Sequence, residues 1–151
     1  MSYRGQCQCG AVTASITAEP VAVRQCWCRQ CQQVAGGAAT NNAIFPTDAV
    51  TLTGAPATHS YAAASGNVLT HSYCADCGTP VMAQSNARPQ FRTFRLGFLD
   101  PGHGLAPQAA IWRPRWHKLE RVAGDRCGTR PSRPTSPSAL RRTCASPRAD
   151  R

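Results

Sequence analysis

Short stretches in which apolar and polar residues alternate run through the first hundred residues of the chain. A period of two is typical of strands with one buried and one solvated face. It predicts strands over residues 11–17, 20–24, 43–45, 49–53, 58–62, 67–73, 79–83 and 90–96. Turn sequences such as Gly54-Ala55-Pro56 and Ser65-Gly66-Asn67 separate them at intervals of roughly 8–12 residues. One short helix is expected within residues 26–37, after Cys31. We therefore expect a mostly β fold of short antiparallel strands.

The composition fits one small domain. The chain has 151 residues, of which 42% are hydrophobic, and it holds 12 Gly and 12 Pro. So many chain-breaking residues exclude long helical bundles and coiled coils. The sequence has no apolar run of about 20 residues, so we expect no membrane span.

Charge divides the chain into two regions. Residues 1–120 hold 9 basic and 5 acidic residues, a net charge of +4, whereas residues 121–151 hold 8 basic and 2 acidic residues, a net charge of +6. The second region is rich in Arg, Pro and Ser and poor in large apolar residues, so we expect it to be a disordered tail. Nucleic-acid binding is expected only through this tail. The alternative that we favour is an extension without function, which could be the product of a shifted reading frame.

The nine cysteines are the most informative feature. They comprise Cys7 and Cys9; Cys26, Cys28 and Cys31; Cys74 and Cys77; and, in the tail, Cys127 and Cys144. The first residues of the chain lack the apolar segment of a secretory signal, so we expect a cytoplasmic protein. Disulfides do not persist in a reducing cytosol, and clustered cysteines are better explained as metal ligands. Disulfides between groups remain an alternative, and the two tail cysteines are read as incidental.

The seven clustered cysteines divide most simply into four and three. Four thiolates close a structural zinc site, whereas three protein ligands leave a position open for chemistry. The triplet Cys26, Cys28 and Cys31 can reach one ion from one loop, which leaves Cys7, Cys9, Cys74 and Cys77 for the other. A rival grouping joins Cys28 and Cys31 with Cys74 and Cys77 as a zinc ribbon, but the 42 residues between the pairs exceed the roughly 15–20 of common ribbons.

Glycine follows two of these groups, at Gly10 and Gly78. A metal knuckle folds the backbone back toward its sulfurs, often through a left-handed residue that glycine adopts without penalty. We therefore expect a left-handed conformation at both positions.

Four motifs carry a resemblance to a known family. They are Gly5-Gln6-Cys7-Gln8-Cys9-Gly10-Ala11-Val12, Cys26-Trp27-Cys28-Arg29-Gln30-Cys31 (followed by Gly36-Gly37), Ser72-Tyr73-Cys74-Ala75-Asp76-Cys77-Gly78-Thr79-Pro80-Val81 and Ile111-Trp112-Arg113-Pro114-Arg115-Trp116. Together they resemble the glutathione-dependent formaldehyde-activating enzyme family, which also includes centromere protein V. The resemblance spans residues 5–116, so residues 1–120 are expected to form the family's zinc domain.

The resemblance implies a β-tent type of fold with two zinc ions. In that family the outer pairs hold a structural ion, here Cys7, Cys9, Cys74 and Cys77, and the middle triplet holds a labile, catalytic ion, here Cys26, Cys28 and Cys31. The implied activity is that of a carbon–sulfur lyase, which joins the thiol of glutathione to formaldehyde or splits the adduct. The implied partners are therefore a small thiol and an aldehyde adduct.

The chain departs from the family at two positions. The family commonly has His between the first two cysteines of the triplet and before the C-terminal aromatic stretch, whereas this chain has Trp27 and Ala110. Trp27 is read either as a pocket wall or as a packing residue. The identity of the substrate is therefore open.

The remaining polar residues give weaker signals. His59, His71, His103 and His117 are each expected to be surface or strand residues, and His71 is the best candidate for chemistry among them. A basic rim from Arg29, Arg92 or Arg95 could steer the carboxylates of glutathione, although each alone is expected to be a solvated residue. Two further functions stay open beside the lyase, a zinc-stabilised binding module and a degenerate member without metal at the triplet.

Overall fold

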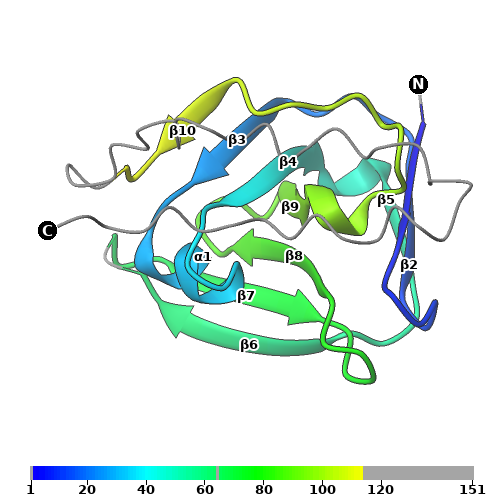
Figure 1. The fold of residues 1–151 in the computed structure, drawn as a ribbon, viewed down its shortest axis with the longest axis horizontal. Coiled ribbons are helices and arrows are strands. Elements are labelled where there is room, and N and C mark those ends of the chain that lie inside the picture. Colours follow the sequence, from blue (N-terminus) through cyan, green and yellow to red (C-terminus); the bar gives the residue numbers. More distant parts are fainter. Residues whose placement is uncertain (1, 64, 114–151) are drawn as a thin grey trace, which may run out of the picture. The chain divides into compact units, whose positions relative to one another are not determined.

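The computed structural model describes residues 2–63 and 65–113, which form two β-sheets (Figure 1). The smaller sheet contains β1 (Tyr3–Gln6), β2 (Thr13–Ile16) and β5 (Val50–Thr53), in the order β1-β2-β5. Both of its pairings are antiparallel. The predicted tail, residues 121–151, lies outside the described residues.

The larger sheet contains β3 (Ala22–Cys26), β4 (Thr40–Pro46), β6 (Ala57–Ala62), β7 (Val68–Tyr73), β8 (Pro80–Ser85), β9 (Phe91–Arg95) and β10 (Ala109–Ile111). Their order is β10-β3-β4-β9-β8-β7-β6. Neighbouring strands pair antiparallel, except that β10 runs parallel to β3. The end of the described segment therefore returns to the strand that leads into the cysteine triplet.

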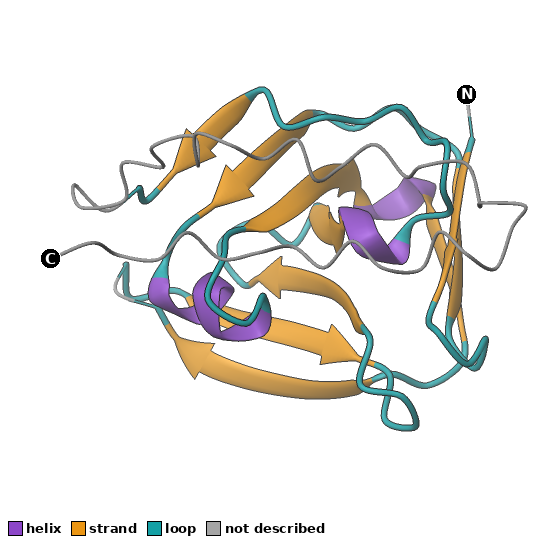
Figure 2. Cartoon of the chain, viewed as in Figure 1, coloured by secondary structure: helices purple, strands orange, loops and turns teal. Residues whose placement is uncertain are grey.

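Three short helical segments complete the described fold (Figure 2). They are α1 (Arg29–Val34) and the 3-10 helices η1 (Thr47–Ala49) and η2 (Leu96–Phe98). Helix α1 follows β3 directly and contacts β4. No helix among the described residues is both long and apolar enough to cross a membrane.

The prediction of a mostly β fold with short antiparallel strands is confirmed, and each of the eight predicted strands overlaps an observed one. Three details were wrong. Strands β1 and β10 were not expected, β10 is parallel to its neighbour, and α1 begins before Cys31 and includes it. Both missed strands have four residues or fewer, too short for a period of two to stand out.

The hydrophobic core lies between the two sheets. Ile16 of the smaller sheet and Phe45, Phe94 and Phe98 have no more than 1% of their surface exposed. The ring centroids of Phe45 and Phe94 are 6.1 Å apart, and the tilted ring of Tyr3 packs against Phe45 at 5.5 Å. Burial of these apolar side chains removes the inner faces of both sheets from water and holds the sheets together.

The other face of the larger sheet carries polar residues. In the register, Cys26 pairs with Thr40 and Asn42 pairs with Arg95. Paired residues in an antiparallel ladder share a face, and so do residues two apart along a strand. Cys26, Thr40, Asn42 and Arg95 therefore lie on one face of the sheet.

The same face continues across the sheet to the histidines. Thr93, two residues before Arg95, pairs with Ala83, Ala83 pairs with His71, and His71 pairs with His59. We call this surface, defined by Cys26, Thr40, Arg95 and His71, the site face.

Candidate metal centres

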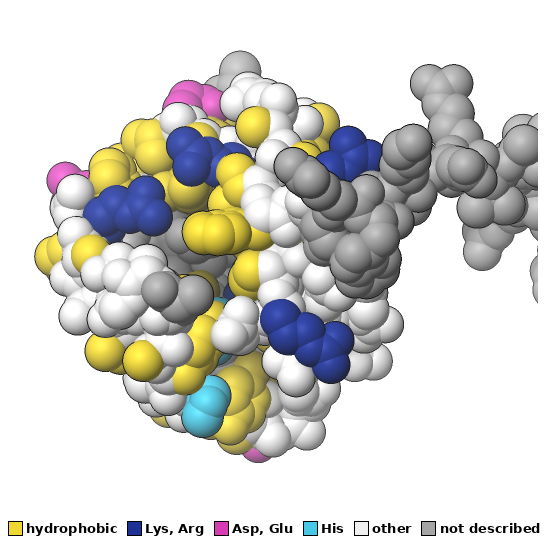
Figure 3. All heavy atoms as spheres, turned by 90° about the vertical axis from the view of Figure 1, so that its left-hand side faces the viewer, with side chains coloured by type: hydrophobic (Ala, Val, Ile, Leu, Met, Phe, Trp, Pro, Cys, Tyr) yellow, Lys and Arg dark blue, Asp and Glu magenta, His cyan; other side chains and the backbone are white. Residues whose placement is uncertain are grey.

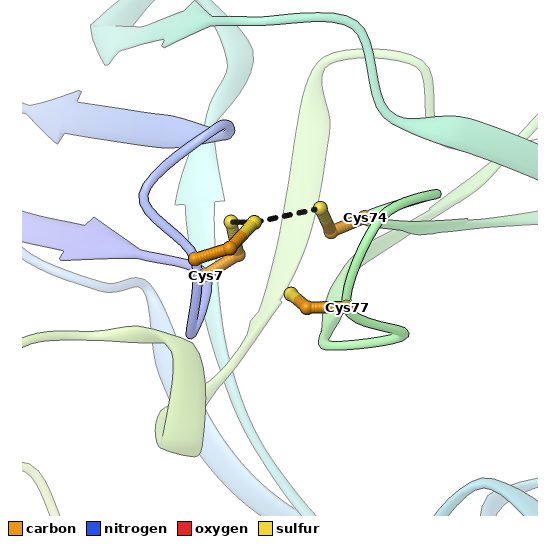
Figure 4. A group of neighbouring side chains, drawn as sticks. Cys7, Cys74 and Cys77 are labelled. Carbon is orange, nitrogen blue, oxygen red and sulfur yellow. Dashed lines mark hydrogen bonds between the residues drawn. The ribbon is translucent and has the colours of Figure 1, made fainter.

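Four cysteine sulfurs meet at one end of the molecule (Figure 4). Cys7 and Cys9 lie in the loop between β1 and β2, and Cys74 and Cys77 lie in the loop between β7 and β8. Their four Sγ atoms are within 4.8 Å of one another. Cys7 and Cys74 are each 1% exposed and belong to the hydrophobic core. We call these residues the four-cysteine cluster.

The spacing of these sulfurs fits a tetrahedral metal site. Zinc binds thiolates at about 2.3 Å, so the sulfurs of a tetrahedral site lie about 3.8 Å apart. The Sγ atoms of Cys7 and Cys9 are 3.5 Å apart, and those of Cys9 and Cys74 are 3.7 Å apart. A disulfide would need about 2.05 Å. The clustered cysteines form no disulfide within the described part of the chain.

Both loops of this cluster are knuckles with the expected glycines. Gly10 has φ +80° and donates its N–H to the carbonyl of Cys7, and Gly78 has φ +72° and donates to the carbonyl of Cys74. In the first knuckle the N–H of Val12 points at the sulfur of Cys7 over 3.2 Å. Such N–H groups stabilise a thiolate, so the backbone is preorganised for a negatively charged ligand.

Thr79 links the two knuckles. Its hydroxyl accepts a hydrogen bond from the N–H of Gln8 over 3.1 Å and lies 3.1 Å from the sulfur of Cys77. The hydrogen bond from the Thr79 side chain, aided by its backbone N–H, lowers the pKa of Cys77 to about 5. This cysteine therefore ionises readily, as a metal ligand must.

Three further sulfurs meet where β3 leads into α1. The Sγ atoms of Cys26, Cys28 and Cys31 are within 4.8 Å of one another. Cys26 ends β3, Cys28 is the N-cap residue of α1, and Cys31 lies in the first turn of that helix. The Cys28 sulfur accepts the N–H of Cys31 over 3.4 Å, so one side chain both caps the helix and belongs to what we call the three-cysteine cluster.

Hydrogen bonds and packing of Trp27 and Gln32 hold the loop that carries this cluster in place. Trp27 is 4% exposed, its indole N–H donates to the side chain of Gln25 over 2.9 Å, and its backbone N–H donates to Ile111 of β10. The buried amide of Gln32 donates to the Trp27 carbonyl over 2.7 Å. Trp27 is therefore a packing residue that holds the cysteine loop against β10.

Ionisation within the three-cysteine cluster is uneven. A hydrogen bond from Cys26 lowers the pKa of Cys31 to about 5, against the effect of burial, and the Thr40 hydroxyl and the charge of Arg95 act in the same direction. The same interaction with Cys31, together with burial, raises the pKa of Cys26. Cys31 is therefore the first of this pair to become a thiolate.

A cavity of about 340 Å³ opens over the site face, and its lining includes Gly78 and Pro80 next to Cys77 but none of the three cysteines of this cluster. Val34 of α1, His59, His71 and Arg95 contribute to its walls. Figure 3 views the side on which α1 lies in Figure 1 and shows histidine side chains next to hydrophobic ones, with basic side chains at separate points around them. The cavity thus joins apolar surface to a few polar groups, as small-molecule sites do.

Tyr61 and His71 form a pair on the same face. The Tyr61 hydroxyl lies 3.4 Å from Nε2 of His71, and their rings meet edge to face at 5.3 Å. Burial raises the pKa of Tyr61 to about 12, and the negative charges of Cys28 and Cys31 add to the effect. Burial, together with the charges of Arg95 and His59, lowers the pKa of His71 to about 4. Near neutral pH His71 is therefore an uncharged acceptor beside a protonated phenol.

The structure brings the cysteines together in the predicted groups of four and three, and it does not join Cys28 and Cys31 with Cys74 and Cys77 as the ribbon alternative required. An all-thiolate donor set suits zinc and other soft ions. Both clusters therefore fit metal binding, by their donor type and, in the four-cysteine cluster, by their spacing. Cys127, Cys144 and His117 lie outside the described residues.

The basic residues were expected to be solvated one by one, and this was wrong for Arg95. Arg29 is exposed on α1, and half-buried Arg92 donates to the Gln84 side chain over 3.2 Å. Arg95 is only 8% exposed and donates from Nη1 to Thr40 and Asn42. Ala110 is exposed on β10, where it pairs with Gln25.

Thr40, Asn42, Tyr61 and Thr79 were not singled out from the sequence. Polar residues at Thr40 and Asn42 interrupt the apolar alternation just before the predicted strand 43–45. Their spacing of two was the available signal, because it places both on one face of a longer strand. Nothing local marked Tyr61, whose partner His71 comes from another strand. Thr79 lies in a quoted motif two residues after Cys77, but its contact with Gln8 in the other loop follows only from the fold.

Comparisons with known proteins agree with this geometry. The family model described as glutathione-dependent formaldehyde-activating enzyme matches residues 2–115. The fold is similar to that in a crystal structure of a Rhodobacter sphaeroides protein, with a TM-score of 0.55, 19% identity and coverage of 71% of this chain and 98% of the other. A search of curated proteins found no match. The family match covers most of the chain and every residue of both clusters, and the chain therefore belongs to the glutathione-dependent formaldehyde-activating enzyme family.

Proposed function

We propose that this protein is a zinc-dependent carbon–sulfur lyase that makes and splits the adduct of a small thiol with a small aldehyde. In this proposal the four-cysteine cluster holds a structural ion and the three-cysteine cluster holds a labile, catalytic one. Family membership supports a formaldehyde-activating or related function. Glutathione and formaldehyde are therefore the first substrates to test.

The observation that carries the proposal is that three sulfurs, from Cys26, Cys28 and Cys31, lie within 4.8 Å of one another and can hold one ion. A zinc ion held by three protein ligands keeps one coordination position for a ligand from outside, and when bound it favours ionisation of an incoming thiol. A closed site with four protein ligands offers no such position. The two clusters therefore suit different tasks.

The reaction itself needs one proton to change places. Addition of a thiol to formaldehyde forms a carbon–sulfur bond, breaks the carbonyl π bond, and moves the thiol proton to the carbonyl oxygen. The Tyr61–His71 pair is not tuned to carry this proton, because its pKa values of about 12 and about 4 lie far from neutral pH. Neutral His71 can nevertheless accept, and the Tyr61 hydroxyl can donate, a hydrogen bond that orients a reactant. Cys31, the more acidic thiol of its pair, anchors the site as a thiolate.

The test is catalysis of the exchange of formaldehyde between its hydrate and its glutathione adduct, measured by NMR. We expect faster exchange with the wild-type protein and none above background with a Cys28→Ser variant. The Cys28→Ser variant should keep the fold of the β-sheets, because Cys28 is not part of the core. Unfolding of this variant would instead indicate a structural role for the three-cysteine cluster.

A variant of the other cluster provides the matched control. Cys9→Ser also removes one sulfur from a cluster. It should not disturb the hydrophobic core, because Cys9 is exposed. We expect it to lower thermal stability while any folded fraction keeps its activity. A purified protein that carries metal at both clusters yet accelerates no thiol–aldehyde exchange would favour the binding-module alternative.

A further inference from the structure

Arg95 is a buried cation without an acidic partner among the described residues. It is 8% exposed, and its hydrogen bonds there go to the neutral side chains of Thr40 and Asn42. Its Nε is also buried and has no hydrogen-bond partner in the described part of the chain. Burying a charge is costly unless an opposite charge or a full set of hydrogen bonds compensates for it. The contacts with Thr40 and Asn42 alone therefore do not explain a cation at this position.

Thr40 connects Arg95 to the three-cysteine cluster. It begins β4 and lies directly opposite Cys26 in the register. Its Oγ1 lies 3.3 Å from Nη1 of Arg95, and its hydroxyl forms a hydrogen bond with the sulfur of Cys31. One side chain therefore contacts both the guanidinium and a sulfur of the cluster.

The chemistry of Arg95 fixes the direction of the hydrogen bonds in this group. A guanidinium only donates, so the atom of Asn42 that faces it is the carbonyl oxygen, and the amide nitrogen faces Thr40. Oγ1 of Thr40 accepts from Nη1 of Arg95 and, over 2.9 Å, from Nδ2 of Asn42. Both lone pairs of this oxygen are then occupied, which leaves its one proton for the sulfur of Cys31. The hydrogen bonds thus run in one direction, from the guanidinium to the sulfur.

The charge of Arg95 matches that of a metal centre with three thiolates. A divalent ion with three thiolates has a net charge of −1, and the guanidinium brings the total to zero. A thiolate that binds at the open position then makes the total −1, whereas without Arg95 it would become −2. Repulsion between charges is strongest away from water, and Cys26 and Cys31 are buried. A cation at this place therefore lowers the cost of binding a fourth sulfur.

We propose that Arg95 is the counter-ion of the metal centre at the three-cysteine cluster and that Thr40 connects it to Cys31 by hydrogen bonds. This proposal rests on the function proposed above, in which this cluster holds the labile ion. Arg95 is then a positioning residue, which touches neither the ion nor the substrate. It helps the cluster to keep its ion and to accept a thiolate at the open position.

The first test is a double-mutant cycle on the affinity of this cluster for zinc, measured by competition with a chromophoric chelator. Loss of a hydrogen-bond partner of a metal ligand typically lowers metal affinity 10–100-fold. We expect Arg95→Met and Thr40→Val each to weaken binding of the labile ion at least about tenfold. The loss in the double variant should be smaller than the product of the two single losses, because Arg95 acts through Thr40. Losses that multiply fully, or affinities equal to that of the wild type, would overturn the proposal.

Two further variants serve as controls. Thr40→Ser keeps the hydroxyl and should keep most of the affinity. Arg92→Met removes a cation from the same strand, but Arg92 donates to Gln84, and the affinity should not change. The four-cysteine cluster should keep its ion in every variant, which distinguishes an effect on one centre from a general loss of the fold. Loss of both ions together in Arg95→Met and Thr40→Val would show that the two residues have only a structural role.

The second test reports on the hydrogen bond to Cys31 itself. With cobalt in place of the labile zinc, the sulfur-to-cobalt charge-transfer band depends on the energy of the sulfur lone pairs. We expect this band to move to lower energy in Thr40→Val, because the sulfur loses the hydrogen bond that stabilises its lone pair. Thr40→Ser should restore the band. This test does not need a folded Arg95→Met variant, and an unshifted band in Thr40→Val would contradict the proposal.

These results separate the two proposals. Weakened zinc binding in Arg95→Met and Thr40→Val, with no thiol–aldehyde exchange by the wild type, would keep the counter-ion and remove the reaction. Exchange by the wild type, with unchanged zinc affinity in both variants, would keep the reaction and remove this role of Arg95.

Discussion

Thr79 and Thr40 occupy similar places beside the two cysteine clusters. The hydroxyl of Thr79 interacts with the sulfur of Cys77, and that of Thr40 interacts with the sulfur of Cys31. A hydroxyl that donates to a thiolate lowers the pKa of the thiol and offsets part of the negative charge that builds up where several sulfurs meet. In each cluster the cysteine with a threonine partner has its pKa lowered to about 5.

We expect a Thr79→Val variant to weaken the four-cysteine cluster. The substitution keeps the shape of the side chain but removes the hydrogen bonds to Gln8 and Cys77, at a cost of about 1–2 kcal/mol in the free energy of unfolding. Zinc should also be lost faster to a chelator. Thr58→Val, at an exposed position on β6, is the control and should change neither quantity. Equal rates of zinc loss in all three proteins would contradict this role of Thr79.

His71 makes the stability of the protein depend on pH. Burial lowers its pKa to about 4, below the usual value near 6.5 that it regains on unfolding. The unfolded state therefore binds more protons than the folded state as the pH falls from about 6.5 toward 4, and the free energy of unfolding decreases over this range. Above pH 6.5 His71 contributes no pH dependence.

A His71→Gln variant isolates this effect. Acid also protonates cysteines, but that effect is common to both proteins. The difference in stability between wild type and variant should shrink or reverse from pH 7 to pH 4.5, as measured by urea unfolding at each pH. Parallel stability curves would mean that His71 titrates normally in the folded protein.

Among the secondary-structure elements, β4 illustrates where sequence patterns failed. The apolar alternation predicted only residues 43–45, whereas β4 spans Thr40–Pro46. Asparagine is depleted in strands, so Asn41 and Asn42 prevented the first half of this strand from being predicted. Asn42 is nevertheless buried, because it accepts a hydrogen bond from Arg95. Asn42 lies on the site face beside Arg95, as is expected where function overrides local preference, whereas Asn41 is exposed.

Helix α1 has little stability of its own. It has six residues, no acidic residue in its first turn, and a cysteine as its N-cap. Isolated helices of this length do not form in water. Because Cys28 and Cys31 belong to both the helix and the three-cysteine cluster, we expect the helix to depend on the metal.

Removal of the labile ion should therefore expose the amides of α1. We expect hydrogen exchange in Arg29–Val34 to accelerate at least about tenfold after mild chelation, while the amides of β8 (Pro80–Ser85) keep their protection. The comparison of the two segments excludes global unfolding as the cause. Unchanged protection in α1 would show that the helix is held by packing alone.

For the whole molecule, the four-cysteine cluster joins distant parts of the chain. Cys9 and Cys74 are 65 positions apart, and their loops belong to different sheets. Closing a long loop is entropically costly, and metal binding worth on the order of 10 kcal/mol can offset this cost in a small protein. The sequence predicted this grouping by counting ligands. It could not predict that Arg95 and His71 share one surface, because that follows from the pairing of the three strands β9, β8 and β7.

The uneven charge of the chain allows the contribution of residues 121–151 to be tested separately from that of residues 1–120. Most of the net charge of +10 lies in residues 121–151, which carry +6. We expect a chain trimmed to residues 1–120 to keep its zinc content and thiol–aldehyde activity. Any salt-dependent DNA binding should disappear on trimming. Retention of that binding by residues 1–120 would place it on the folded domain and favour the binding-module alternative.

The zinc content of the purified protein tests the central claim most directly. The account predicts two ions per chain in the wild type, one of which is lost on mild chelation. It also predicts a single, tightly held ion in a folded Cys28→Ser variant. A wild-type protein with one ion that resists chelation, or a Cys28→Ser variant that still binds two, would show that the triplet does not hold a removable metal with an open position.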